Sequence, residues 1–121
     1  MGFVDLDEAS DPDHFVAEGY SQGRGAVLRA KHFEVIKIHF AKGEGAEPHA
    51  HKHDQFTYIL SGRLRVTIGD GEEVYEIGPG QATFNPTDVV HSVVALEDTA
   101  ALSVKAPLLE EEEYEATGTL S

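Results

Sequence analysis

The chain has 121 residues, the size of one domain, and its 22 acidic and 9 basic residues give a formal net charge of −13. Because so negative a surface repels phosphate backbones and anionic lipids, this charge argues against binding to nucleic acid or to membranes. The absence of cysteine excludes disulfides and thiolate metal sites, and the acidic N-terminus is unlike a signal peptide, so we expect a soluble, cytoplasmic protein.

The first part of the chain, residues 1–23, is polar and acidic and contains an Asp-Pro-Asp turn signal at 11–13. It lacks the alternation of apolar and polar residues that follows it. We therefore interpret residues 1–23 as an N-terminal arm with one short strand, separate from a domain that begins at residue 24.

Residues 24–107 alternate between short runs rich in β-branched and aromatic residues and clusters of turn-forming residues, such as 69–71 and 85–88. In residues 63–68 every second residue is apolar, the signature of a half-buried strand. No segment has helical periodicity over three turns, so the spacing predicts an all-β antiparallel sandwich or barrel. The runs expected as strands are 25–31, 33–41, 46–51, 55–61, 63–69, 72–77, 81–85, 90–97 and 100–106.

The C-terminal part, residues 108–121, is again acidic and includes four consecutive glutamates at 110–113. Like charges in a row repel each other and favour exposure to water. We therefore interpret residues 108–121 as a solvated tail with a frayed end.

Three of the seven histidines fall within five residues, in the sequence His-Ala-His-Lys-His. On a strand, residues i and i+2 point the same way with Cα atoms about 6.7 Å apart, so His49 and His51 can converge on one metal ion. A single His-x-His pair is weak evidence, because exposed loops often contain one. Among the other histidines, His39 faces either a cavity or solvent, and His32 and His14 are expected at the surface.

The chain must reverse direction after His51 if Gln55 is to join the same site. A straight strand would place Gln55 roughly 20 Å from His49, too far to share an ion. Residues 52–54 are polar and suit a turn, after which Gln55 would open the next strand and face back. His53 would then lie on the bend, where we expect it to face solvent.

The spacing of Gly43, His49, His51, Gln55 and Gly62 resembles the first sequence motif of the cupin superfamily, the RmlC-like cupins. In that motif glutamate usually stands at the position of Gln55. Glutamine is neutral, whereas glutamate carries a negative charge.

A second cupin motif resembles the spacing of Gly80, Pro86, Asp88 and His91. Here Asp88 stands where glycine is usual, and Ala95 where asparagine is usual. Two motifs in order, separated by two expected strands, are far more specific than either motif alone. The resemblance covers about residues 33–106.

The resemblance implies a double-stranded β-helix, a jelly-roll-like cupin barrel formed by two antiparallel sheets. It also implies one divalent metal ion inside the barrel, with His49, His51, Gln55 and His91 as its ligands. Imidazole and amide ligands suit Zn, Ni, Fe, Mn or Cu, and the sequence does not choose among these metals.

Glutamine at position 55 affects the chemistry that such a site would favour. Three imidazoles and an amide are neutral, so a divalent ion would keep its full charge, whereas glutamate would cancel one unit. Such a site disfavours trivalent iron and favours Lewis-acid work on a carbonyl, enol or hydroxyl oxygen. The remaining charge would also attract a carboxylate or enolate into an otherwise negative protein.

The last predicted strand places Leu102, Val104 and Ala106 on one face and Ser103 and Lys105 on the other. This ending, with the histidine segment, looks like small cupins that linearise unsaturated uronic acids. Those enzymes have an Asp-x-Phe-x-Pro segment here, and the acid is missing from this chain. Lys105 and Ser103 are the candidate catalytic residues. Lys105 would bind a carboxylate or act as an acid or base, the alternative being an exposed surface lysine.

The strand that carries Gln55 also predicts an interface. If Gln55 points into the barrel, then Phe56, Tyr58 and Leu60 form an apolar row on the outside. Such a row usually marks an interface, and cupins of this size resemble dimers built by packing such sheets. We therefore expect a homodimer.

Three functions remain open at this point. The first is a metal-dependent, redox-neutral enzyme, an isomerase, lyase or cyclase, whose substrate is a small sugar acid or enol. The second is a metal-dependent dioxygenase, against which Gln55 argues mildly. The third is a non-enzymatic module that binds a small ligand through the metal. Resemblance of fold does not select among them.

Overall fold

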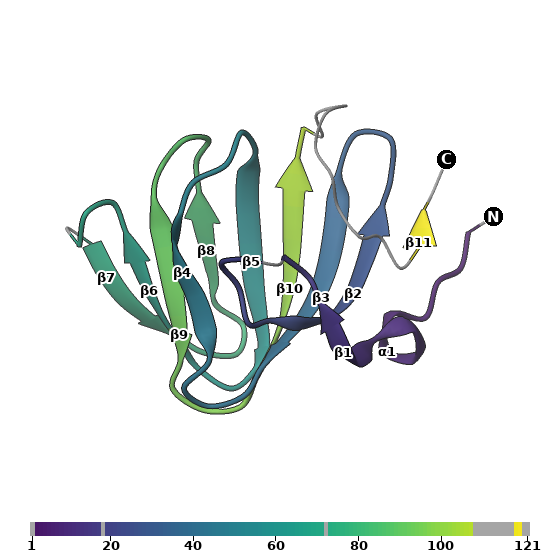
Figure 1. Ribbon diagram of the computed structural model, residues 1–121, viewed down its shortest axis with the longest axis horizontal. Coiled ribbons are helices and arrows are strands. Elements are labelled where there is room, and N and C mark those ends of the chain that lie inside the picture. The colour runs from purple at the N-terminus through teal and green to yellow at the C-terminus, as the bar shows by residue number, and fades with distance from the viewer. Residues whose placement is uncertain (1, 18, 72, 108–117, 120–121) are drawn as a thin grey trace.

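The computed structural model describes residues 2–17, 19–71, 73–107 and 118–119. Two β-sheets face each other across a common interior (Figure 1), so the predicted all-β barrel of two antiparallel sheets is confirmed. Each predicted strand is present, with its ends shifted by at most two residues. In chain order the described elements are α1 (Leu6–Ala9), β1 (Asp11–Phe15), β2 (Arg24–Arg29), β3 (Glu34–Phe40), β4 (Gly45–His49), β5 (Asp54–Ser61), β6 (Leu64–Ile68), β7 (Glu73–Ile77), β8 (Ala82–Asn85), β9 (His91–Ala95), β10 (Thr99–Ala106) and β11 (Gly118–Thr119).

The strand order shows how the two sheets are connected. The larger sheet runs β1-β2-β3-β10-β5-β8, and the smaller sheet runs β4-β9-β6-β7. Consecutive strands such as β4 and β5 lie in different sheets, so the chain crosses repeatedly from one sheet to the other. Within each of these two strand orders, neighbouring strands pair antiparallel. The crossings place the end of β4, the start of β5 and the start of β9 at the same end of the barrel. The first histidine motif lies at the end of β4 and the start of β5.

The hairpin between β6 and β7 illustrates how local sequence determines register. Leu64 and Val66 are buried while Arg65 between them is exposed, as the period-2 pattern predicts. The turn that follows includes Gly71 at φ 83°, a left-handed conformation that glycine adopts without steric cost. Leu64 then pairs with Ile77, and Ile68 with Glu73.

An apolar cluster fills one end of the barrel interior. Its members come from both sheets, which therefore pack against each other through this cluster. We call it the apolar end; it consists of Phe40, Ile59, Leu64, Val66, Ile77, Ala95 and Ala101. At roughly 25 cal/mol per Å² of buried apolar surface, clusters of this kind provide most of the stability of a small domain.

The N-terminal segment is joined to the barrel by main-chain hydrogen bonds. β1 pairs with β2, as expected for one short strand, and residues 20–22 lie along the edge of β4. There, the amide of Glu47 donates to the carbonyl of Tyr20 at 2.7 Å, and the amide of Gln22 donates to the carbonyl of Gly45 at 2.9 Å. Helix α1 was not predicted. It has a single turn, capped by the Asp5 carboxylate, which is too short to produce a periodic pattern.

The C-terminal part differs from the expectation of a frayed tail at Gly118 and Thr119. These residues pair in parallel with Leu28 and Arg29 of β2, beyond the part of β2 that β1 covers, so main-chain groups of an edge strand are available there. The glutamate run at 110–113 lies outside the described residues. Within the described part of the chain, no helix has the length and apolar character needed to span a membrane.

Candidate metal centre

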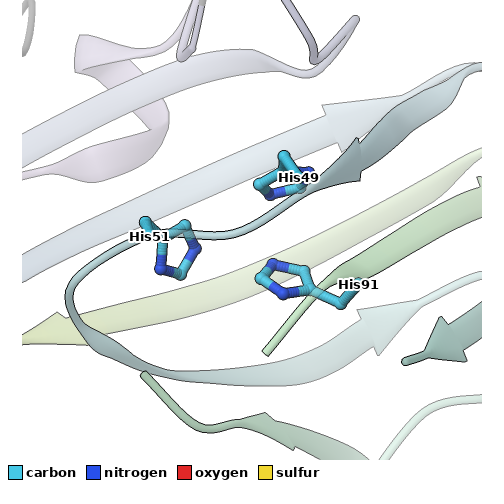
Figure 2. A group of neighbouring side chains, drawn as sticks. All are labelled: His49, His51 and His91. Atoms are coloured by element: carbon cyan, nitrogen blue, oxygen red, sulfur yellow. The ribbon is translucent and has the colours of Figure 1, made fainter. Parts of the chain in front are cut away.

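Three histidines meet at the end of the barrel opposite the apolar end. His49 is the last residue of β4, His51 lies in the loop that follows, and His91 opens β9 directly across from His49. The nitrogen atoms that each ring offers lie within 4.8 Å of one another. Figure 2 shows the three rings grouped around a common space. The structure therefore brings together three of the four residues that the sequence proposed as metal ligands, from separate segments of chain.

Each of these rings has its Nδ1 atom held by a backbone carbonyl. Nδ1 of His49 lies 2.6 Å from the carbonyl oxygen of Glu47, and Nδ1 of His91 lies 3.0 Å from that of Val89. Because a carbonyl only accepts, Nδ1 carries the hydrogen and Nε2 keeps its lone pair. Metal-binding histidines are commonly oriented in this way.

The Nε2 atom of His91 provides a direct test of whether the site fits a metal. This atom is buried and has no hydrogen-bond partner among the described residues. A buried polar atom without a partner is costly and calls for an explanation. A cation shared with the other two rings supplies one.

Gln55, the fourth proposed ligand, opens toward the same space. Its Oε1 lies 3.0 Å from Nε2 of His51, and its Nε2 donates to Oγ of Ser103 at 2.7 Å. Nδ1 of His51 faces the carbonyl of His53 at 3.3 Å. In one tautomer His51 Nε2 donates to Gln55 Oε1 across 3.0 Å; with the hydrogen on Nδ1, both atoms present lone pairs to the same space, as two ligands of one ion do. Two ligands bound at right angles with bonds of 2.0–2.1 Å lie about 2.9 Å apart, so this spacing fits a shared ion.

Burial keeps the imidazoles neutral at physiological pH. It lowers the pKa of His49 and of His51 from 6.5 to about 4, with further lowering from the charges of Lys105 and His91. Burial also lowers the pKa of His91. Because a metal binds the neutral imidazole, these rings are ready to coordinate at pH 7 without losing a proton.

The loops that carry His51 and His91 are fastened to each other. The amide of Asp88 donates to the carbonyl of His51 at 2.9 Å, and the Asp88 carboxylate pairs with Lys52 at 2.7 Å. Asp88 occupies the position where the second motif usually has glycine, and its φ is 65°. The left-handed backbone is thus retained, and aspartate is among the residues that tolerate it.

Ser103 and Lys105 both point inward from β10. Ser103 is 3% exposed, and its Oγ receives hydrogen bonds from Gln55 and, at 3.2 Å, from Thr57. Lys105 is 2% exposed, so the alternative of a surface lysine is wrong. The strand alternation correctly predicted that the two residues share a face. Catalytic roles for the two residues remain predictions.

His53 does not face solvent as expected. It is fully buried, and its Nδ1 lies 3.2 Å from the carbonyl oxygen of Pro107. The expectation was wrong because β5 and β10 pair at Asp54 and Ala106, which brings the residue after β10 over the turn. His39 and His32 are exposed, whereas the side chain of His14 lies outside what the structure describes.

Two residues at this end were missed by sequence reasoning. The ring of Tyr20 stacks on His49, with centroids 4.0 Å apart and planes inclined by 26°. Asn85 is 2% exposed and lies directly across from Gln55. Its sequence context suggested a turn, although the alternation of the strand that it ends would have turned it inward. No sequence signal indicated Tyr20.

These side chains line a cavity of about 60 Å³. Its walls at the metal centre include His49, Gln55, Asn85, His91, Ser103 and Lys105. Val16, Ala17, Tyr20 and Ser21 of the N-terminal segment also line it. A cavity of this size holds a few water molecules, so a larger ligand requires part of this lining to move.

Comparison with known proteins agrees with this arrangement. A family model described as "Cupin domain" matches residues 36–105. The pectin degradation protein KdgF of Dickeya dadantii (strain 3937) is 33% identical over 69 residues, which cover 56% of this chain and 61% of that protein. The chain thus matches about three fifths of that relative's length.

Several solved structures share the fold. KdgF from Halomonas sp. superposes with a TM-score of 0.68 at 24% identity, covering 82% of this chain and 91% of that one. TT1209 from Thermus thermophilus gives 0.69 at 22% identity, with 88% and 98% covered. Oxalate decarboxylase from Bacillus subtilis gives 0.67 at 23% identity, with 85% of this chain but 30% of the other covered. At these identities the likeness concerns the fold alone.

Proposed function

The chain belongs to the cupin domain family, and from that premise we propose that it is a metal-dependent enzyme with a redox-neutral reaction, an isomerase, lyase or cyclase. Its substrate is a small oxygenated or anionic molecule, such as a sugar acid or an enol. The observation that supports this most directly is the convergence of three neutral imidazoles, one of them with a buried, unpartnered Nε2 atom among the residues that the structure describes.

In this proposal His49, His51, His91 and Gln55 hold one divalent ion. When bound there, the ion would polarise a carbonyl, enol or hydroxyl oxygen of the substrate as a Lewis acid. Ser103 orients the amide of Gln55 by accepting its Nε2 hydrogen, which leaves the amide oxygen directed at the histidines. Positioning of this kind commonly affects metal affinity by about 10–100-fold.

The charges at this end favour an anionic substrate. All four proposed ligands are neutral. The ammonium group of Lys105, which lies across from the buried Glu34 of β3, acts on the three histidines as a nearby positive charge. In a chain whose formal net charge is −13, such a centre attracts a carboxylate that the rest of the surface repels. We assign Lys105 to binding that carboxylate.

The similarity to a pectin degradation protein supports a sugar acid as the substrate class. A six-carbon acid exceeds the cavity of about 60 Å³, which is room for a few water molecules. The lining residues of the N-terminal segment, Val16, Ala17, Tyr20 and Ser21, would then move aside on binding. A smaller acid or enol fits with less rearrangement.

The proposal is tested by metal content and turnover together. Elemental analysis of the purified protein should find about one divalent metal per chain, and the absorbance of an unsaturated uronate should fall on incubation. His91→Ala should lose both properties, while the matched variant His39→Ala, at an exposed histidine, should keep both. Oxygen uptake with catechol- or diketone-type substrates would instead favour a dioxygenase. Metal binding without turnover in either assay would favour a binding module.

We further propose that the protein is a homodimer. Phe56, Tyr58 and Leu60 are all exposed on the outer face of β5 (45%, 38% and 43%), and Phe84 of β8 lies beside Phe56. An exposed apolar row of this size usually marks a protein–protein interface, and here we expect it to pack against the same row of a second copy of the chain. Light scattering at tens of micromolar should give the mass of a dimer, and Phe56→Glu should shift it to that of a monomer. A monomeric parent protein would contradict this.

A further inference from the structure

Asn85 is a buried polar residue that the metal centre does not use. Its side chain is 2% exposed and lines the cavity, and its Oδ1 has no hydrogen-bond partner among the described residues. An amide oxygen removed from water normally finds a donor in a folded protein. Here the donor must come from whatever occupies the cavity.

The position of Asn85 relates it to two groups already described. β5 lies between β10 and β8 in the larger sheet, and Gln55 pairs with Lys105 on one side and with Asn85 on the other. Directly opposed residues on one face of a sheet have Cβ atoms about 4.5–5.5 Å apart. The three side chains therefore form one row across the cavity wall, with the proposed metal ligand in the middle.

The two flanks of this row differ in chemistry. Lys105 lies between Gln55 and the buried Glu34 of β3. Its ammonium group still acts on the three histidines as a positive charge, so its side of the row favours a carboxylate. The Asn85 oxygen accepts hydrogen bonds but repels a carboxylate, so its side favours a hydroxyl that donates. A ligand that spans the row needs an anionic group at one end and a hydroxyl at the other.

We propose that Asn85 and Lys105 form a two-point subsite on either side of Gln55 that selects hydroxy-carboxylates. The hydroxyl of the ligand donates to Oδ1 of Asn85, and its carboxylate lies on the side of Lys105. This inference rests on the proposed function, because it takes the ligand to bind at the metal centre. It adds Asn85 as a specificity-determining residue and a hydroxyl group as a requirement of the ligand.

Two small acids test the subsite. Glycolate and methoxyacetate have the same carboxylate and the same α-oxygen, but only glycolate has a hydrogen to donate. Calorimetric titration of the Zn²⁺-loaded protein should show glycolate bound about tenfold more tightly, the effect of one buried hydrogen bond. In Asn85→Leu this ratio should fall to about one, and a Zn²⁺ titration of the same variant checks that the metal centre is retained.

The outcomes separate the subsite from the proposed function. If the parent protein does not bind Zn²⁺, the proposed metal centre is overturned and the subsite with it. If Zn²⁺ binds but the parent protein does not distinguish the two acids, the subsite alone is overturned. The same holds if Asn85→Leu weakens both acids equally. Because the comparison in the parent protein needs no variant, poor folding of Asn85→Leu leaves the test intact, and Asn85→Val then serves as the second variant.

Discussion

The two ends of the barrel interior are built from the same strands but from different side chains. Along β5 the inward residues run from Gln55 at one end to Ile59 at the other, and along β10 from Lys105 to Ala101. The register aligns these changes, because Lys105 pairs with Gln55 and Ala101 with Ile59. One end is consequently an apolar cluster, and the other carries the polar side chains that line the cavity together with apolar residues such as Ile36 and Val93.

This difference separates stability from function within one small domain. The apolar end buries aliphatic side chains from both sheets, which favours folding. The polar end buries Glu34, Asn85 and Lys105, and removing such groups from water costs free energy. The strands continue through both ends, so the apolar end holds the polar side chains in place. Substitutions at the two ends should therefore have different consequences.

The largest effect on stability is expected for Ile59→Ala at the apolar end. Ile59 is fully buried, and truncation of such a residue to alanine removes about 2–5 kcal/mol from the free energy of unfolding. Urea denaturation of the metal-free protein measures this change, with Ile59→Val as a milder control at about 0.5–1.5 kcal/mol. The folded fraction should bind metal as the parent protein does. A folded Ile59→Ala protein with greatly weakened metal binding would show that the apolar end also determines metal affinity, contrary to this division.

The converse is expected for His91→Ala at the polar end. Removal of a ligand should weaken metal binding by at least about 100-fold, more than the loss of a residue that merely orients a ligand. Metal added to the parent protein should raise its melting temperature, since it binds the folded state, and this rise should largely disappear in His91→Ala. The melting temperature of the metal-free variant should change little. A variant that unfolds without metal would show that His91 is needed for the fold.

The two ends also differ in how far the sequence predicts them. Strand alternation and turn signals placed every strand of the barrel from β2 to β10. The same alternation put Ser103 and Lys105 on one face of their strand, and the motif resemblance indicated that this face and Gln55 are directed inward. The apolar end needs nothing more, because burial of every second residue is a local pattern. Motif spacing then identified the three histidines that the fold brings together.

The parts that were missed depend on contacts between distant segments. His53 is buried because Pro107, more than fifty residues away, closes over it. Tyr20 reaches His49 because residues 20–22 join the edge of β4, and no local pattern encodes that pairing. Asn85 stands both at the end of a predicted strand and in a predicted turn before Pro86; strand alternation alone would have turned it inward, and the pairing with β5 then places it across from Gln55.

A smaller effect, confined to the polar end, is expected for Gln55→Glu. The carboxylate cancels one unit of the metal's charge, so the affinity of the metal-loaded protein for anions such as glycolate should fall by about tenfold, on the scale of one charge interaction in a partly buried site. Affinity for the metal itself should rise. Calorimetry with metal and then with glycolate measures both quantities. Equal or tighter anion binding in Gln55→Glu would contradict the role given to the neutral amide.

The smallest expected effect is the response of metal affinity to mild acid. His49 and His51 have a pKa of about 4, so the folded, metal-free protein holds both rings neutral well below pH 6. Protonation competes with the metal only as the pH falls toward 4, and affinity is lost in that window. Between pH 7.5 and 5.5 the protonation of these two rings should change the dissociation constant by less than about twofold. Two rings with an ordinary pKa of 6.5 would weaken binding about 100-fold over the same range.

Titration of the metal-free protein by NMR provides the control for this prediction. The ring signals of His49 and His51 should shift near pH 4. If these two rings instead titrate near pH 6.5, burial does not lower their pKa. The inference that burial keeps these imidazoles neutral for metal binding would then be wrong, whereas the description of the apolar end would be unaffected.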